Sequence, residues 1–192
     1  GVQFSVAEKI QIATALDQLG LDYIEGGWPG ANPTDSDFFA ARPATKATFT
    51  AFGMTKRAGR SADNDDVLAA VLNAGTQAVC LVGKTHDFHV RTALGLTLDE
   101  NLENIAASVA HAVAKGRQTL FDAEHFFDGF KTNPDYAVAA CKAAFDAGAR
   151  WIVLCDTNGG TLPPEVARVV AQVIASGIPG SRLGIHCHDD TG

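Results

Sequence analysis

The chain has 192 residues, of which 46% are hydrophobic and 19% charged, and its formal net charge is −7. This balance is typical of a globular protein with a sizeable core, and an acidic chain without a basic block argues against sequence-tolerant nucleic-acid binding. No apolar run approaches the length that spans a bilayer, which argues against a membrane protein, and nothing resembles a signal peptide. Its four cysteines, Cys80, Cys141, Cys155 and Cys187, form no CxxC motif and predict buried free thiols of a cytoplasmic protein.

One unit recurs along the chain: a helix, a glycine that caps it, and a short apolar strand. Strands are predicted over residues 21–25, 48–52, 77–82, 118–122, 151–156 and 182–188. The expected capping glycines are Gly20, Gly75, Gly116, Gly148 and Gly180. Strands that alternate with helices in this rhythm predict βαβ units and a parallel sheet.

The helices carry their own start signals. Two pairs have the spacing of a capping box, Ser5 with Glu8 and Thr97 with Glu100. Asn133 and Thr161 each precede a proline-containing first turn and are predicted to cap it. A shorter helix is predicted around residues 36–41.

The polar residues favour a barrel over an open sheet. A dinucleotide-binding open sheet needs a glycine-rich turn such as GxGxxG after its first strand, and the sequence has none. Polar residues instead follow nearly every strand, as at the mouth of a (β/α)8 TIM barrel. The six predicted strands are two short of the eight that close a barrel. Residues 1–192 are therefore predicted to form part of a catalytic barrel domain. They would supply strands 2 to 7, with the first and last barrel strands outside the chain.

His186 and His188 end the last predicted strand, one residue apart. Side chains at i and i+2 of a strand point to the same face, so both imidazoles converge while Cys187 points away. This geometry suits one shared metal ion, with nearby carboxylates completing its ligands. The competing interpretation is a pair of strand-end histidines that only bond to their neighbours.

Other strand ends add acids and a hydroxyl to the same rim. Glu124 shares a strand face with Asp122 if both are extended, and it is a candidate general base, with an ion pair as the alternative. Thr157 is a candidate for binding a substrate carboxylate, whereas Asp156 is predicted to hold a neighbouring loop. Glu25 precedes glycines that suit close approach of a ligand.

The loop predicted after residue 82 contains Lys84 and two histidines, His86 and His89. Such a loop suggests a second metal site, although exposed loop histidines are commoner, and we interpret it as substrate-facing. His125 comes directly after Glu124 and is predicted to face the opposite way.

Four stretches of the chain, residues 23–30 (YIEGGWPG), 121–131 (FDAEHFFDGFK), 155–160 (CDTNGG) and 184–188 (GIHCH), resemble the citramalate synthases. These enzymes belong with the 2-isopropylmalate and homocitrate synthases among the metal-dependent TIM-barrel acyltransferases and lyases. The likeness runs along essentially the whole chain. EGGWPG and DAEHFFDG are more specific to the citramalate branch than HxH or DTxG.

The resemblance implies a condensation of acetyl-CoA with a 2-keto acid, most simply pyruvate, in branched-chain amino-acid biosynthesis. It implies that His186 and His188 bind a divalent metal ion, Mg²⁺ or Mn²⁺ with Zn²⁺ as an alternative. Thr157 would contact the keto-acid carboxylate, Glu124 would help to activate acetyl-CoA, and Glu25 would order the substrate site. The resemblance also implies a homodimer in the cytoplasm.

The sequence departs from the family pattern in three ways. The family's catalytic arginine and metal-binding aspartate would lie before residue 1, and a further asparagine would lie beyond the seventh strand. Asp189 stands where the family usually has asparagine. The family's effector-sensing C-terminal domain is not in the sequence. A 2-isopropylmalate synthase, a hydroxymethylglutaryl-CoA-lyase-like enzyme and a non-catalytic binding module remain as alternatives.

Overall fold

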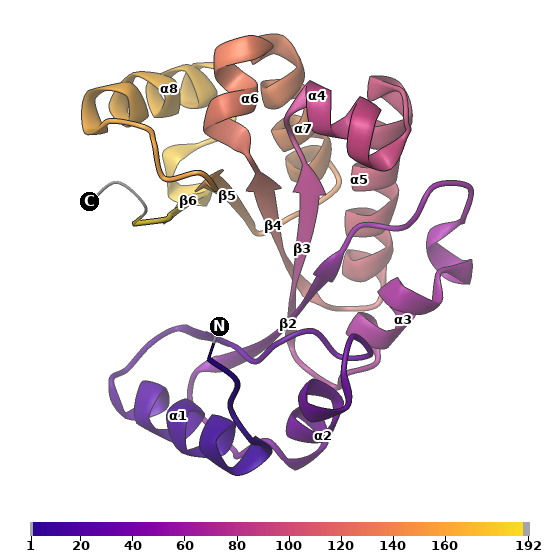
Figure 1. Cartoon of the computed structure of the whole chain (residues 1–192), viewed down its shortest axis with the longest axis vertical. Helices are drawn as coiled ribbons and strands as arrows, with labels where there is room; N and C mark the ends of the chain where they lie inside the picture. The colour runs from indigo at the N-terminus through magenta and orange to yellow at the C-terminus, as the bar shows by residue number, and fades with distance from the viewer. Residues whose placement is uncertain (1, 190–192) are drawn as a thin grey trace.

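The computed structural model describes residues 2–189 and contains one parallel sheet whose six strands follow chain order (Figure 1). The strands are β1 (Tyr23–Glu25), β2 (Thr48–Met54), β3 (Ala78–Lys84), β4 (Gln118–Glu124), β5 (Trp151–Asp156) and β6 (Leu183–Cys187). The sheet curves, and the helices lie on its outer side (Figure 1). Parallel strands in sequential order with an outer layer of helices are the arrangement of a TIM barrel, so the predicted fold is confirmed for this span.

The longer helices connect successive strands, except for α1, which precedes β1. They are α1 (Val6–Gln18), α2 (Pro33–Ala41), α3 (Asp66–Leu72), α5 (Leu98–Ala114), α6 (Phe126–Thr132), α7 (Pro134–Asp146) and α8 (Pro163–Ala175). After β3 the chain forms the single turn α4 (Asp87–His89) and a short π-helical segment (Val90–Leu94) before α5. Short 3₁₀ turns, Ala62–Asn64 and Gly180–Arg182, precede α3 and β6.

The predicted cap residues are confirmed except at α8, and the short helix predicted around residues 36–41 begins earlier, at Pro33. Both capping boxes form, and Asn133 caps α7 by accepting a hydrogen bond from the Tyr136 backbone at 3.2 Å. The prediction that Thr161 caps α8 is wrong, because the N-cap is Leu162. With Leu162 as the cap, Pro163 takes the first helical position, where its fixed φ and missing N–H cost nothing.

Four of the five predicted capping glycines have positive φ, and Gly180 does not. The helix before β6 ends at Ala175, and Gly177 with φ 106° follows it instead. This earlier end lets Ile178 turn inward, where it is fully buried. Gly180 belongs to the 3₁₀ turn that leads into β6.

The core lies between the outer face of the sheet and the helices. Alternate strand residues on this face, including Leu81, Phe121 and Leu154, have no exposed surface. Small α7 residues, Ala137, Ala140, Cys141 and Ala144, are also fully buried. A helix whose buried residues are small can pack close to the sheet. The strand residues that alternate with the core residues face the barrel interior.

The expectation of four buried free thiols holds for three of them. Cys80, Cys141 and Cys155 are buried and free, whereas Cys187 is free and exposed. Cys187 lies on the outer face of β6, the last strand of the described sheet. Within residues 2–189, no helix combines the length and the hydrophobicity needed to cross a membrane.

Candidate active site

A pocket of about 480 Å³ lies inside the curved sheet at the carboxyl ends of the strands. Its lining includes all five residues to which the family resemblance assigned a role in the site, Glu25, Glu124, Thr157, His186 and His188. The others are Gly26, Gly27, Phe52, Val82, Asp122 and Cys155. Residues from six strand ends therefore meet in one cavity, as the barrel hypothesis requires.

The register of the sheet explains this convergence. Residues that are paired across parallel strands project from the same face. Val82 pairs with Asp122, and Cys155 pairs with His186. Because β4 remains extended to Glu124, two residues beyond its predicted end, Asp122 and Glu124 share the inner face.

His186 and His188 lie side by side, with their ring centroids 5.0 Å apart. His186 is on β6, and the backbone N–H of His188 donates to the Asp156 carbonyl at 3.2 Å, which continues the pairing beyond the strand. Both side chains line the pocket, as the alternation predicted. Two imidazoles and nearby carboxylates are a suitable donor set for a divalent cation.

Glu124 forms an ion pair with Lys84, with 2.5 Å between Lys84 Nζ and Glu124 Oε2. The two side chains are 19% and 25% exposed, and their residues are register partners on β3 and β4. The ion pair that the sequence left as an alternative is therefore present, but it lies at the pocket wall. Lys84 ends β3 and does not belong to the loop.

Thr157 is oriented by a backbone hydrogen bond. Its Oγ1 accepts the N–H of His125 at 2.9 Å. Since the hydroxyl oxygen is used as an acceptor, its own hydrogen is free to be donated into the pocket. This arrangement suits recognition of an anionic oxygen.

His125 adopts the left-handed conformation, with φ 57°, at the junction of β4 and α6. Its ring lies edge-on to His89, with 4.3 Å between centroids, and is not part of the pocket lining. Its Nδ1 is buried without a hydrogen-bond partner, and burial lowers the pKa of the ring. The prediction that His125 faces away from Glu124 is thus consistent with its position.

The loop histidines form a stack beside the rim. The His86 and His89 rings are 4.8 Å apart, and His86 Nδ1 lies 3.2 Å from Asp87 Oδ1. Neither histidine lines the pocket, and within the described residues the group of metal-ligating atoms lies elsewhere. The structure therefore gives no support to a second metal site in this loop.

Asp156 holds the segment that carries Thr157. It is only 3% exposed, and its carboxylate accepts hydrogen bonds from Thr161 N at 2.9 Å and Thr161 Oγ1 at 3.0 Å. This matches the predicted role of Asp156 in holding a loop. It also explains why Thr161 is not available to cap α8.

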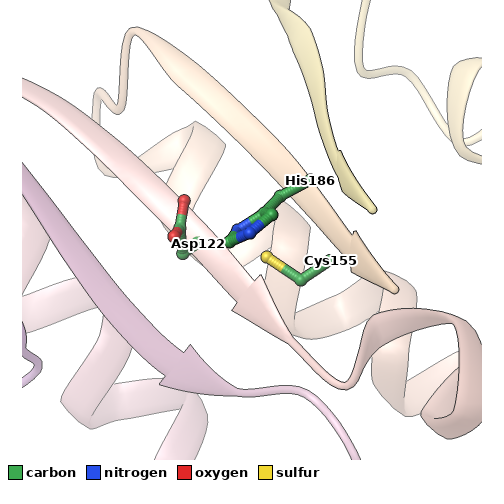
Figure 2. A group of neighbouring side chains, drawn as sticks. All are labelled: Asp122, Cys155 and His186. Carbon is green, nitrogen blue, oxygen red and sulfur yellow. The ribbon is translucent and has the colours of Figure 1, made fainter. Parts of the chain in front are cut away.

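Two pocket residues that carry possible metal-ligand atoms were given no role by the sequence, Asp122 and Cys155. Their side chains point toward His186 from neighbouring strands (Figure 2). Burial, together with the charge of Asp122, raises the pKa of Glu25 to about 7, although a hydrogen bond with Cys80 opposes the rise. For Cys155 a signal was present, because Thr157 comes two residues later, directly after the strand ends at Asp156, and strand alternation predicts that the two side chains face the same way.

Comparison with known proteins places the chain in a family, because residues 1–192 match the HMGL-like family throughout. The chain is a member of the HMGL-like family. It is 51% identical to the (R)-citramalate synthase of Streptomyces coelicolor and 45% identical to that of a Synechocystis species. It is 31% identical to a 2-isopropylmalate synthase of Solidesulfovibrio magneticus. The resemblance to citramalate synthases is confirmed.

The chain is fully covered by these matches, yet it spans only 36–37% of each of these three relatives. Among solved structures it resembles the HMG-CoA lyase of Bacillus subtilis, with a TM-score of 0.80 and 20% identity over 100% of this chain and 64% of that one. An HMG-CoA lyase of Acinetobacter baumannii in complex with coenzyme A and 3-methylmalate gives a TM-score of 0.74 at 17% identity, over 100% of this chain and 62% of that one. At these identities the structures support the fold alone.

Proposed function

We propose that the protein to which this chain belongs condenses acetyl-CoA with a 2-keto acid, most simply pyruvate to give citramalate. The observation that carries the proposal is the single pocket lined by Glu124, Thr157, His186 and His188. It occurs in a chain that is 43–51% identical to (R)-citramalate synthases. The product would enter branched-chain amino-acid biosynthesis, and residues 1–192 would supply part of the catalytic barrel.

His186 and His188 would hold the divalent ion of such an enzyme. The donor set fits, because the two imidazoles are adjacent and carboxylates of the pocket lie close by. Nitrogen and oxygen donors accommodate Mg²⁺, Mn²⁺ or Zn²⁺. When bound, such an ion supplies a Lewis acid that polarises the ketone of the keto acid.

The chain's own residues would bind and orient the substrates. Thr157, whose hydroxyl hydrogen is free to be donated, would bind the keto-acid carboxylate. Glu124 would take part in activating the acetyl group, and Lys84 would hold its carboxylate in place. Glu25, the last residue of β1, would order the substrate side of the pocket.

The chemistry of one structural relative is compatible with this ligand class. That lyase was solved with coenzyme A and 3-methylmalate. 3-Methylmalate is a positional isomer of citramalate, which is 2-methylmalate. A barrel of this fold thus accommodates coenzyme A together with a methyl-substituted four-carbon dicarboxylate.

The test uses the full-length protein with a divalent metal, acetyl-CoA and one keto acid at a time. We expect release of free coenzyme A thiol with pyruvate and a kcat/KM at least tenfold lower with 2-oxoisovalerate. The opposite preference would indicate a 2-isopropylmalate synthase. Cleavage of a hydroxyacyl-CoA without condensation would indicate a lyase, and no turnover would favour a binding module.

Two further properties complete the proposal. We expect a homodimer, which light scattering of the purified protein would test. We also expect a cytoplasmic location, in keeping with free cysteines, which cell fractionation would test.

A further inference from the structure

We propose that the pocket contains a second donor set, Asp122, Cys155 and His186, that binds a thiophilic divalent ion such as Zn²⁺ or Cd²⁺. This site differs from the pair His186 and His188 because it uses a thiolate. It shares His186 with that pair, so the two modes of binding exclude one another.

The geometry brings the three donors together from three adjacent strands, β4, β5 and β6. One ligand atom from each residue, an oxygen, a sulfur and a nitrogen, lies within 4.8 Å of the other two. Figure 2 shows the three side chains directed toward a common space. Asp122 is partly buried, Cys155 is buried and His186 is exposed, so the site opens on the side of His186.

The bond lengths of zinc fit this space after a small adjustment. Zn–S bonds are about 2.3 Å, and Zn–N and Zn–O bonds are about 2.0–2.2 Å, so donors at tetrahedral angles stand roughly 3.4–3.7 Å apart. Closing the triangle from 4.8 Å requires the donors to approach by at most about 1.1–1.4 Å. His186 can supply this movement, because its side chain is exposed at the end of β6.

The type of donor decides which ion is selected. A thiolate favours Zn²⁺ and softer ions and is a poor ligand for Mg²⁺, which prefers oxygen. On binding, the Cys155 S–H bond breaks, the sulfur–metal bond forms and the proton leaves to solvent, without any change in oxidation state. Three protein ligands leave a fourth position open for water.

A consequence follows for the proposed enzyme, and this part alone rests on the proposed function. A thiophilic ion held by Cys155 withdraws His186 from His188. We therefore expect Zn²⁺ or Cd²⁺ to inhibit a Mg²⁺-supported reaction, and we expect Cys155→Ser to relieve that inhibition. The binding site itself is tested without turnover.

The test uses metal-free full-length protein and Co²⁺ as a spectroscopic substitute for Zn²⁺. Wild-type protein should develop the near-ultraviolet charge-transfer band of a cobalt–thiolate bond at one equivalent of Co²⁺, and Cys155→Ser should lose it. Cys187→Ser is the matched control, because Cys187 is next to His186 on β6 but lies on the opposite face. It should keep the band.

X-ray absorption of the wild-type zinc complex gives an independent reading that requires no variant to fold. One sulfur neighbour at about 2.3 Å supports the site. A shell of nitrogen and oxygen alone would overturn it, as would a cobalt–thiolate band that persists in Cys155→Ser. Because neither measurement involves substrate, failure of this site and failure of the proposed function are distinguishable.

Discussion

The ion pair between Lys84 and Glu124 allows the chemical and structural roles of Glu124 to be separated. Glu124→Gln keeps the shape of the side chain and removes its charge. If Glu124 acts as a catalytic base or helps to activate the acetyl group, kcat should fall by about 10²–10⁴-fold. Thiol release with acetyl-CoA and pyruvate measures this fall in the full-length protein.

The structural cost of the same change can be bounded from the geometry. At an effective dielectric constant of about 20, unit charges 2.5 Å apart attract by roughly 7 kcal/mol before desolvation and side-chain ordering are subtracted. Exposed pairs contribute about 0–1 kcal/mol, and breaking a buried pair costs about 3–5 kcal/mol. The side chains are 19% and 25% exposed, so we expect an intermediate loss of about 1–2 kcal/mol. This corresponds to a fall of roughly 2–8 °C in the midpoint of the barrel transition.

A double-mutant cycle with Lys84→Met is the control. If the residues act as a pair, the double variant should be less destabilised than the sum of the two single variants. The reasoning is refuted for catalysis if Glu124→Gln unfolds early but retains kcat. It is refuted for stability if the coupling between the two substitutions is zero.

Three further outcomes are expected. Replacing both His186 and His188 with alanine should abolish binding of the catalytic metal, measured by elemental analysis, and retention of full metal content and activity would reject the site. The backbone at His125 has φ 57°, a left-handed conformation that glycine adopts without the strain it causes in other residues. His125→Gly should therefore be more stable than His125→Ala by about 1 kcal/mol in thermal unfolding. Equal stability of the two variants would contradict backbone strain at this position. A β-carbon at Gly129 would lie 2.6 Å from a backbone oxygen, so Gly129→Ala should lower the free energy of unfolding by about 1–3 kcal/mol. The control Gly160→Ala should be nearly neutral, because a β-carbon there would have nothing within 4 Å. Similar thermal midpoints for the two variants would disprove the close contact.

Local patterns in the sequence were sufficient for the architecture and for much of the site. Alternation along β6 placed His186 and His188 on one face, because a strand repeats every two residues. Polar residues after successive strands indicated one rim, because parallel strands end at the same edge of a barrel. Capping boxes located the starts of α1 and α5, because their hydrogen bonds lie within four residues of chain.

The contacts between elements were decided by the tertiary structure. Lys84 meets Glu124, and Cys155 meets His186, because the strands are aligned by the packing of helices on the outer face. The sequence placed Lys84 in a loop and gave Cys155 no partner. The start of α8 also depended on a contact with the preceding strand, since Asp156 at the end of β5 binds Thr161 and leaves Leu162 as the cap. Short-range patterns identify the face of a strand on which a residue lies. The relative register of separate strands is set by long-range packing, and this register determines which residues of neighbouring strands meet.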